Sequence, residues 1–128
     1  MASEAEASMR ILVVDDNELV RRGVVDLLSS KKNWEVCGEA HDGAEALQKA
    51  RELRPDLVLL DISMPGMNGL EAARQLRQEQ SGTKIIMMSQ HGRREVLPRV
   101  IQAGANDCVD KSCLATELVT SIERLEAA

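Results

Sequence analysis

Short runs of aliphatic residues alternate along the chain with segments that have the period of a helix. The runs cover residues 10–14, 34–40, 56–60, 84–88 and 107–109. They recur roughly every 20 to 25 residues, a spacing that is typical of repeated strand–helix units. Three runs are apolar at successive positions, as expected of strands that are covered on both faces. The pattern predicts an α/β domain with a parallel sheet.

The segments between the runs place apolar residues three or four positions apart, which is the period of a helix with one buried face. The clearest stripes are Leu19, Val20, Val24, Leu27 and Leu28; Ala46, Leu47, Ala50 and Leu53; Leu70, Ala73 and Leu76; and Leu114, Leu118, Ile122 and Leu125. Asp42 followed by Glu45 matches a capping box, so we expect a helix to begin there.

The ends of the last two helices are marked by other residues. Gly104 suits the carboxyl end of the fourth helix, and Ser112 is a candidate cap of the last helix. Pro98 lies inside the fourth helical segment, where it lacks an amide and crowds the preceding turn. We therefore expect this helix to start late, near Leu97, or to be kinked there.

Five strand–helix units predict a flavodoxin-like, doubly wound (βα)5 fold with parallel strands in the order 2-1-3-4-5. The chain has 128 residues, which suits one domain. We expect a flexible arm at residues 1–8 and the domain at residues 9–127. In such sheets, ligands bind beyond the carboxyl ends of the strands.

Composition narrows the classes of function. The formal net charge of −5 argues against direct binding of nucleic acid, which needs clustered Lys and Arg. No apolar run approaches the roughly 20 residues of a membrane span. The first residues lack the features of a signal peptide, so we expect a cytoplasmic protein. Three cysteines without C-x-x-C spacing predict buried free thiols rather than disulfides or a zinc site.

Polar residues follow four of the five predicted strands. Asp15 and Asp16 come after the first strand, Asp61 ends the third, Ser89 ends the fourth and Lys111 follows the fifth. A parallel sheet brings these carboxyl ends to one edge, so we expect the five side chains to share one site.

Taken singly, each residue has a purely structural explanation. Asp16 or Asn17 could cap the first helix, Ser89 could belong to a turn, and Lys111 could be a surface lysine. Together, however, three carboxylates in one cleft repel each other unless a cation lies among them. Carboxylate oxygens suit Mg²⁺. Such a cation and a lysine would make the pocket accept a phosphoryl group.

Four motifs lie in one order along the chain: VVDDNE, LVLLDISMPGMNG, IIMMS and AGANDCVDKS. With these motifs, residues 10–126 or so resemble the receiver domain of two-component response regulators. The resemblance implies that Asp61 accepts a phosphoryl group from a sensor histidine kinase or a phosphotransfer protein. It also implies that the chain is a signalling phosphoacceptor that catalyses only its own phosphorylation and dephosphorylation.

The resemblance implies roles for the neighbouring residues as well. Asp16 and Asp61 would hold Mg²⁺ or Mn²⁺ through their carboxylates, Asp15 directly or through a water, and Ser63 through its backbone carbonyl. Ser89 and Lys111 would bind the phosphoryl group. Ser63 and His91 are candidate modulators of the reaction rate.

Partners follow from the same resemblance. The face made by the fourth helix, the fifth strand and the last helix would address an output domain or a second copy of the chain. The first helix, with Leu19, Val20 and Gly23 near the site, would dock the kinase.

Two positions depart from the family pattern. Cys108 stands where receivers commonly carry Tyr or Phe, so the usual ring rotation is not possible and the signal must pass through Ser89 and the backbone. Ser112 follows the lysine, where Pro in a cis peptide is frequent, which leaves the isomer of the Lys111–Ser112 bond open. Ser112 together with AGAN resembles the LuxR-like (NarL/FixJ) receivers.

Other functions explain less of the pattern. A phosphohydrolase of the haloacid dehalogenase type would need a second Asp two residues after the nucleophile, where Ser63 stands. A flavodoxin-like cofactor binder would need a phosphate-binding loop after the first strand, where DDNE repels phosphate without a metal. A degenerate receiver that serves only as an interaction module stays open because of Cys108.

Overall fold

The computed structural model describes residues 9–127, and the predicted arm at residues 1–8 lies outside them. The strands are β1 (Met9–Val14), β2 (Trp34–Ala40), β3 (Leu57–Asp61), β4 (Lys84–Ser89) and β5 (Asp107–Asp110). The helices are α2 (Glu18–Ser29), α3 (Gly43–Leu53), α4 (Gly69–Glu79), α5 (Arg93–Gln102) and α6 (Leu114–Ala127), with a short 3₁₀ turn, η1 (Lys111–Cys113). The strands are parallel in the order β2-β1-β3-β4-β5, which confirms the predicted topology.

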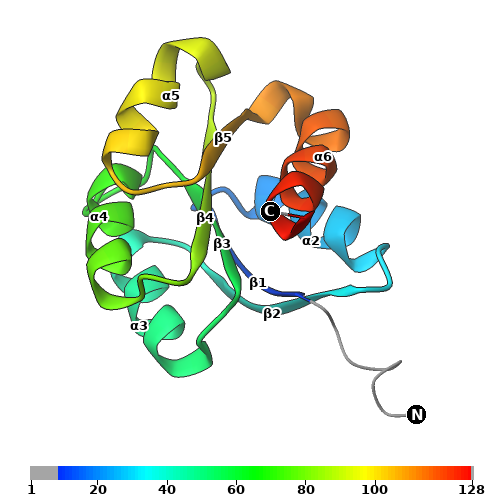
Figure 1. Cartoon of the computed structure of the whole chain (residues 1–128), viewed down its shortest axis with the longest axis horizontal. Helices are drawn as coiled ribbons and strands as arrows, with labels where there is room; N and C mark the ends of the chain where they lie inside the picture. Colours follow the sequence, from blue (N-terminus) through cyan, green and yellow to red (C-terminus); the bar gives the residue numbers. More distant parts are fainter. Residues whose placement is uncertain (1–8, 128) are drawn as a thin grey trace.

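Two layers of helices cover the sheet (Figure 1). Helices α3, α4 and α5 lie on one face, while α2 and α6 lie on the other. Successive residues of β3 alternate between the two layers: Val58 and Leu60 pack with the first, Leu57 and Leu59 with the second. Because both faces are covered, an unbroken apolar run is the correct pattern for this strand.

Side chains and backbone hydrogen bonds define the helix ends. Asp42 Oδ1 accepts a hydrogen bond from the Glu45 amide at 2.8 Å, as the capping-box pattern predicts. Asn17 caps α2 by accepting from the Val20 amide at 3.1 Å. At the end of α5, Gly104 has a φ of +100°, and the amides of residues 104 and 105 bond back to the last turn, as in a Schellman motif.

Helix α5 corrects one prediction. It begins at Arg93, so a late start near Leu97 is wrong, and Pro98 lies within the helix. The Gly92 carbonyl accepts hydrogen bonds from the amides of Glu95 and Val96, which forms the first turn ahead of the proline. The proline therefore removes one amide from a helix that has already begun.

The start of α6 differs as well. Ser112 does not cap this helix; its amide and its hydroxyl both donate to Asp110 Oδ1, at 2.9 and 2.8 Å. Asp110 instead caps the 3₁₀ turn that precedes α6. No peptide bond within residues 9–127 is cis, which includes the Lys111–Ser112 bond.

All three cysteines are free thiols, but only Cys108 is buried, whereas Cys37 and Cys113 are partly exposed. The prediction of three buried thiols is therefore wrong for two of them, because Cys37 lies in the edge strand β2 and Cys113 in the turn before α6. No helix of the described part is long and apolar enough to cross a membrane.

Candidate phosphoryl and metal site

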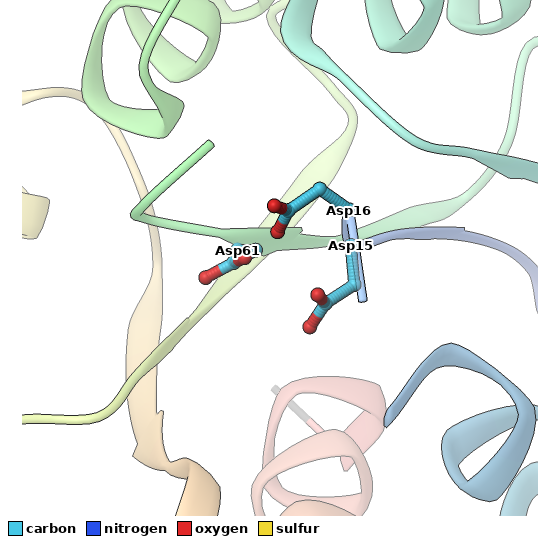
Figure 2. A group of neighbouring side chains, drawn as sticks. All are labelled: Asp15, Asp16 and Asp61. Atoms are coloured by element: carbon cyan, nitrogen blue, oxygen red, sulfur yellow. The ribbon is translucent and has the colours of Figure 1, made fainter. Parts of the chain in front are cut away.

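The five predicted site residues meet at one edge of the sheet. Asp15 and Asp16 continue β1, and Asp61 is the last residue of β3. Figure 2 shows the three carboxylates turned toward a common space, and one oxygen from each lies within 4.8 Å of the others. Ser89 ends β4, and Lys111 follows β5. The strand register thus brings together residues that are up to 96 positions apart, from Asp15 to Lys111.

Lys111 forms ion pairs with two of the acids. Its Nζ lies 2.8 Å from Asp15 Oδ2 and 3.1 Å from Asp61 Oδ1. The three side chains are nearly excluded from solvent, with exposed fractions of 11% for Lys111, 0% for Asp15 and 3% for Asp61. At this burial the ammonium is the charge that allows two carboxylates to lie together.

The environment changes the acidity of these groups. Burial, together with the charge of Asp15, raises the pKa of Asp61 to about 7, even though Lys111 acts to lower it. Burial lowers the pKa of Lys111, but its contacts with Asp15 and Asp61 outweigh burial, so the net shift is upward. The site therefore keeps Lys111 charged and leaves negative charge that is only partly compensated.

The two carboxylate oxygens of Asp15 have different neighbours. Asp15 Oδ1 accepts from the Asn17 amide at 2.8 Å. Asp15 Oδ2 is buried, and within residues 9–127 the group that lies close to it is the Lys111 ammonium, at 2.8 Å. A buried carboxylate oxygen beside two further acids is a donor set that fits a hard divalent cation. The residues present therefore fit Mg²⁺ or Mn²⁺.

The turn after β3 holds Asp61 in place. The Ser63 amide donates to Asp61 Oδ1 at 3.2 Å, and the Gly69 amide donates to the Ile62 carbonyl at 2.8 Å. A Cβ at position 69 would lie only 2.1 Å from the backbone oxygen of Asp61. Only glycine lets the start of α4 approach the strand end this closely.

Between residues 11 and 123 the sequence matches the family model of the response regulator receiver domain. The chain belongs to this family. Receiver domains act in two-component systems, in which phosphorylation and conformational switching are general, and they bind Mg²⁺ at an acidic pocket.

The sequence is similar to those of several response regulators. It is 40% identical over 114 residues to the response regulator GacA of Pseudomonas viridiflava, a match that covers 89% of this chain but 53% of GacA. It is 36% identical to the chemotaxis protein CheY of Thermotoga maritima, covering 91% of this chain and 96% of CheY. The chain thus spans about half the length of relatives such as GacA.

Solved structures of response regulators have the same fold as this chain. A LuxR-family response regulator from Aurantimonas sp. SI85-9A1 superposes with a TM-score of 0.88 at 36% identity, covering 94% of this chain and 86% of that one. The receiver domain of the putative response regulator NarL from Mycobacterium tuberculosis gives 0.87 at 35% identity, covering 96% and 98%. These similarities confirm the LuxR-like class that the sequence predicted.

In this receiver Ser89 is 3% exposed, and its Oγ accepts a hydrogen bond from the His91 amide at 2.9 Å. The hydroxyl hydrogen of Ser89 is not used in that bond. His91 and Ser63 are exposed residues of the loops that follow β4 and β3. Ser89 is thus held at the site, while His91 and Ser63 face solvent beside it.

Sequence reasoning missed one group of residues in this receiver. Cys108 is fully buried among core residues, and its carbonyl accepts from Arg93 Nε at 3.1 Å. Arg93 Nη2 also donates to Asp107 Oδ1 at 2.8 Å, and Ser121 Oγ donates to Asp107 Oδ2 at 2.6 Å. This Asp107 network ties β5 to α5 and α6. The one sequence signal for this network was an acid, Asp107, at the start of the apolar run 107–109.

Proposed function

We propose that this receiver is a phosphorylation-controlled switch in which Asp61 is the phosphoacceptor. The observation that carries the proposal is the Asp61 carboxylate, held at the end of β3 with Lys111 Nζ at 3.1 Å and two acids beside it. The phosphoryl donor is a phosphohistidine on a sensor histidine kinase or a phosphotransfer protein. We further propose that residues 9–127 form the receiver domain and that the protein acts in the cytoplasm.

In the transfer, one Asp61 carboxylate oxygen attacks the phosphorus atom. A P–O bond forms, the P–N bond of the phosphohistidine breaks, and the electron pair of that bond returns to the imidazole. The product is an acyl phosphate on Asp61. Lys111 pairs with a phosphoryl oxygen, and the free hydroxyl hydrogen of Ser89 donates to another.

A divalent cation completes the site in this proposal. Asp15, Asp16 and Asp61 would hold Mg²⁺ or Mn²⁺ through their carboxylates, and Ser63 would contribute its backbone carbonyl. When bound, the cation supplies positive charge that offsets the phosphoryl oxygens. The exposed side chains of Ser63 and His91 adjust how fast water removes the phosphoryl group.

The conformational change that follows phosphorylation is then transmitted to the face made by α5, β5 and α6. Ser89 moves toward the phosphoryl group and draws the following loop with it, and Arg93 is the fourth residue after Ser89. A shift of Arg93 changes its bonds to Asp107 and to the Cys108 carbonyl. This route needs no aromatic ring at position 108. The altered face addresses an output domain that regulates transcription, or a second copy of the receiver.

The test is the intact mass of the protein after incubation with acetyl phosphate, with and without Mg²⁺. We expect a phosphoryl adduct that requires Mg²⁺, is absent from Asp61→Asn and is kept in Asp26→Asn, a control at an exposed aspartate of α2. An adduct on Asp61→Asn would overturn the assignment of the phosphoacceptor. A folded wild type without any adduct would favour a degenerate receiver that acts only as an interaction module.

A further inference from the structure

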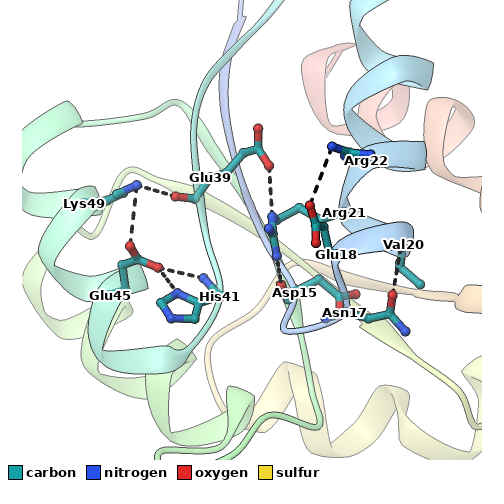
Figure 3. Close-up of polar contacts among 10 residues, drawn as sticks. All are labelled: Asp15, Asn17, Glu18, Val20, Arg21, Arg22, Glu39, His41, Glu45 and Lys49. Carbon is teal, nitrogen blue, oxygen red and sulfur yellow. Dashed lines mark hydrogen bonds and ion pairs between the residues drawn. The ribbon is translucent and has the colours of Figure 1, made fainter.

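Arg21 of α2 connects the backbone of Asp15, one of the site acids, to Glu39 near the end of β2 (Figure 3). Its Nη1 donates to the Asp15 carbonyl at 2.7 Å, and its Nε donates to Glu39 Oε1 at 2.9 Å. The Arg21 side chain is only 18% exposed, although its helix lies on the surface. A guanidinium can make both bonds at once because its donors form a rigid planar fork.

Glu39, which accepts the second hydrogen bond of Arg21, is itself bonded to α3 through its backbone. The Glu39 carbonyl accepts from Lys49 Nζ of α3 at 2.6 Å, and Lys49 pairs with Glu45 at 3.7 Å (Figure 3). Arg21 therefore reaches the half-exposed carboxylate of a residue whose backbone is fixed to α3. It is connected to β2 and, through β2, to α3.

Asp15 is attached to β2 a second time, through its own amide. That amide donates to the Ala40 carbonyl at 3.1 Å, one residue after Glu39. The amide and the carbonyl of Asp15 are thus both fixed to the same strand end, the first directly and the second through Arg21.

Asp16 depends on this backbone for its direction. The Asp15 carbonyl belongs to the peptide group that leads into Asp16. Within residues 9–127, no hydrogen bond or ion pair holds the exposed Asp16 side chain. By contrast, the Asp15 side chain is fixed by the Asn17 amide and by Lys111. The orientation of that one peptide thus sets where the Asp16 carboxylate lies relative to Asp15 and Asp61.

We propose that Arg21 is a positioning residue for the divalent cation, acting through the Asp15 carbonyl with Glu39 as its anchor. This inference rests on the metal site of the proposed function and deepens it. Arg21 does not touch the cation or the phosphoryl group. It reduces the freedom of the peptide before Asp16, so the carboxylates are already arranged when a cation arrives.

The test is direct binding of Mn²⁺ to the full chain, followed by the EPR signal of free Mn²⁺ and competed with Mg²⁺. We expect Arg21→Met, which keeps an unbranched apolar chain but no donor, to raise the Kd about 10-fold. Arg21→Lys keeps the charge but cannot make both bonds, so its Kd should fall between those of the wild type and Arg21→Met. Glu39→Gln keeps an acceptor and should change the Kd by about twofold or less.

Arg22 is the matched control. It is the next residue of α2 and 71% exposed, and its one ion pair within residues 9–127 is with Glu18 at 3.6 Å. Arg22→Met should bind Mn²⁺ like the wild type. If Arg21→Met is folded and also binds like the wild type, the positioning role is overturned. If Arg21→Met does not fold, Arg21→Lys decides the question by the same comparison.

Other outcomes separate this inference from the proposed function. A wild type that binds no Mn²⁺ and forms no acetyl phosphate adduct would remove the metal site and the phosphoacceptor together. Alternatively, the wild type could bind Mn²⁺ and form the adduct, while Arg21→Lys has an unchanged Kd and a lower free energy of unfolding. That result would leave the receiver chemistry intact. In that case Arg21 would serve stability alone.

Discussion

Arg93 and Asp107 form an ion pair, with 2.8 Å between Nη2 and Oδ1, that closes the open edge of the sheet beside β5. Among the described strands β5 pairs only with β4, so on its other side its backbone groups have no partner from another described strand. The same guanidinium covers one of them by donating to the Cys108 carbonyl. One exposed side chain thus protects the strand edge and links it to the start of α5.

Removing this side chain should lower stability. We expect Arg93→Ala to reduce the free energy of unfolding by about 1 to 2 kcal/mol, a modest value because Arg93 is 45% exposed. Urea denaturation followed by the fluorescence of Trp34, the one tryptophan, measures it. Arg94 is the control, because it is exposed and forms no hydrogen bond or ion pair in the described part. Equal effects of the two alanines would show that the Asp107 contact contributes nothing.

Asp107 should make stability depend on acid pH. Burial raises its pKa, but hydrogen bonds from Ser121, Arg93 and the Cys108 amide together outweigh burial and hold the pKa below the ordinary 3.8. A group with a depressed folded pKa contributes stability above its unfolded pKa and loses it as the pH falls through the folded value.

Asp107→Asn should therefore be less stable than the wild type by a constant amount above about pH 5, and the difference should shrink below about pH 4. Parallel urea curves at several pH values measure this difference. The other acids with lowered pKa values, such as Glu45 and Asp110, are present in both proteins and cancel. A difference that stays constant into the acid range would contradict the depressed pKa.

Gly69 should be intolerant of any side chain. In Gly69→Ala the new Cβ would meet the Asp61 carbonyl at 2.1 Å, so the turn after β3 has to shift. We expect a loss of about 1 to 3 kcal/mol in unfolding free energy. We also expect slower phosphorylation by acetyl phosphate, since Asp61 moves with the turn. Mass spectrometry and urea denaturation measure the two effects.

Gly23 offers the opposite case. It lies inside α2, and a Cβ there would meet nothing within 4 Å. Gly23→Ala should raise the free energy of unfolding by about 0.5 to 1 kcal/mol, because alanine loses less backbone freedom in a helix. If Gly69→Ala and Gly23→Ala change stability alike, the close approach to the Asp61 carbonyl is not the reason that position 69 requires glycine.

Cys108 should be protected from alkylation in the native protein. It is fully buried, and burial together with the charge of Asp107 raises the pKa of its thiol to about 11. Iodoacetamide at neutral pH should modify the partly exposed Cys113 first and reach Cys108 only when the protein unfolds. Peptide mapping after timed labelling tests this order. Native labelling of Cys108 as fast as Cys113 would contradict the buried position.

The sequence by itself determined the strands and their order. Parallel strands buried on both faces require unbroken apolar runs. The bounds of the runs at 84–88 and 107–109 therefore lie within one residue of the bounds of β4 and β5. The convergence of Asp15, Asp61 and Lys111 was predictable for a related reason. Carboxyl ends of parallel strands share an edge, so residues that follow the runs have to meet there whatever the helices do.

Only the tertiary structure decided the contacts that helices make with strand ends. Arg21 with Glu39, and Arg93 with Asp107, pair across 18 and 14 positions, and no local pattern selects these partners. Each pairing depends on how a helix docks and on which long side chain then reaches a buried acceptor. Likewise, Pro98 predicted a late helix from local sterics alone. In the folded chain, hydrogen bonds to Gly92 form the first turn upstream of it, and the docked side chain of Arg93 holds that turn against β5.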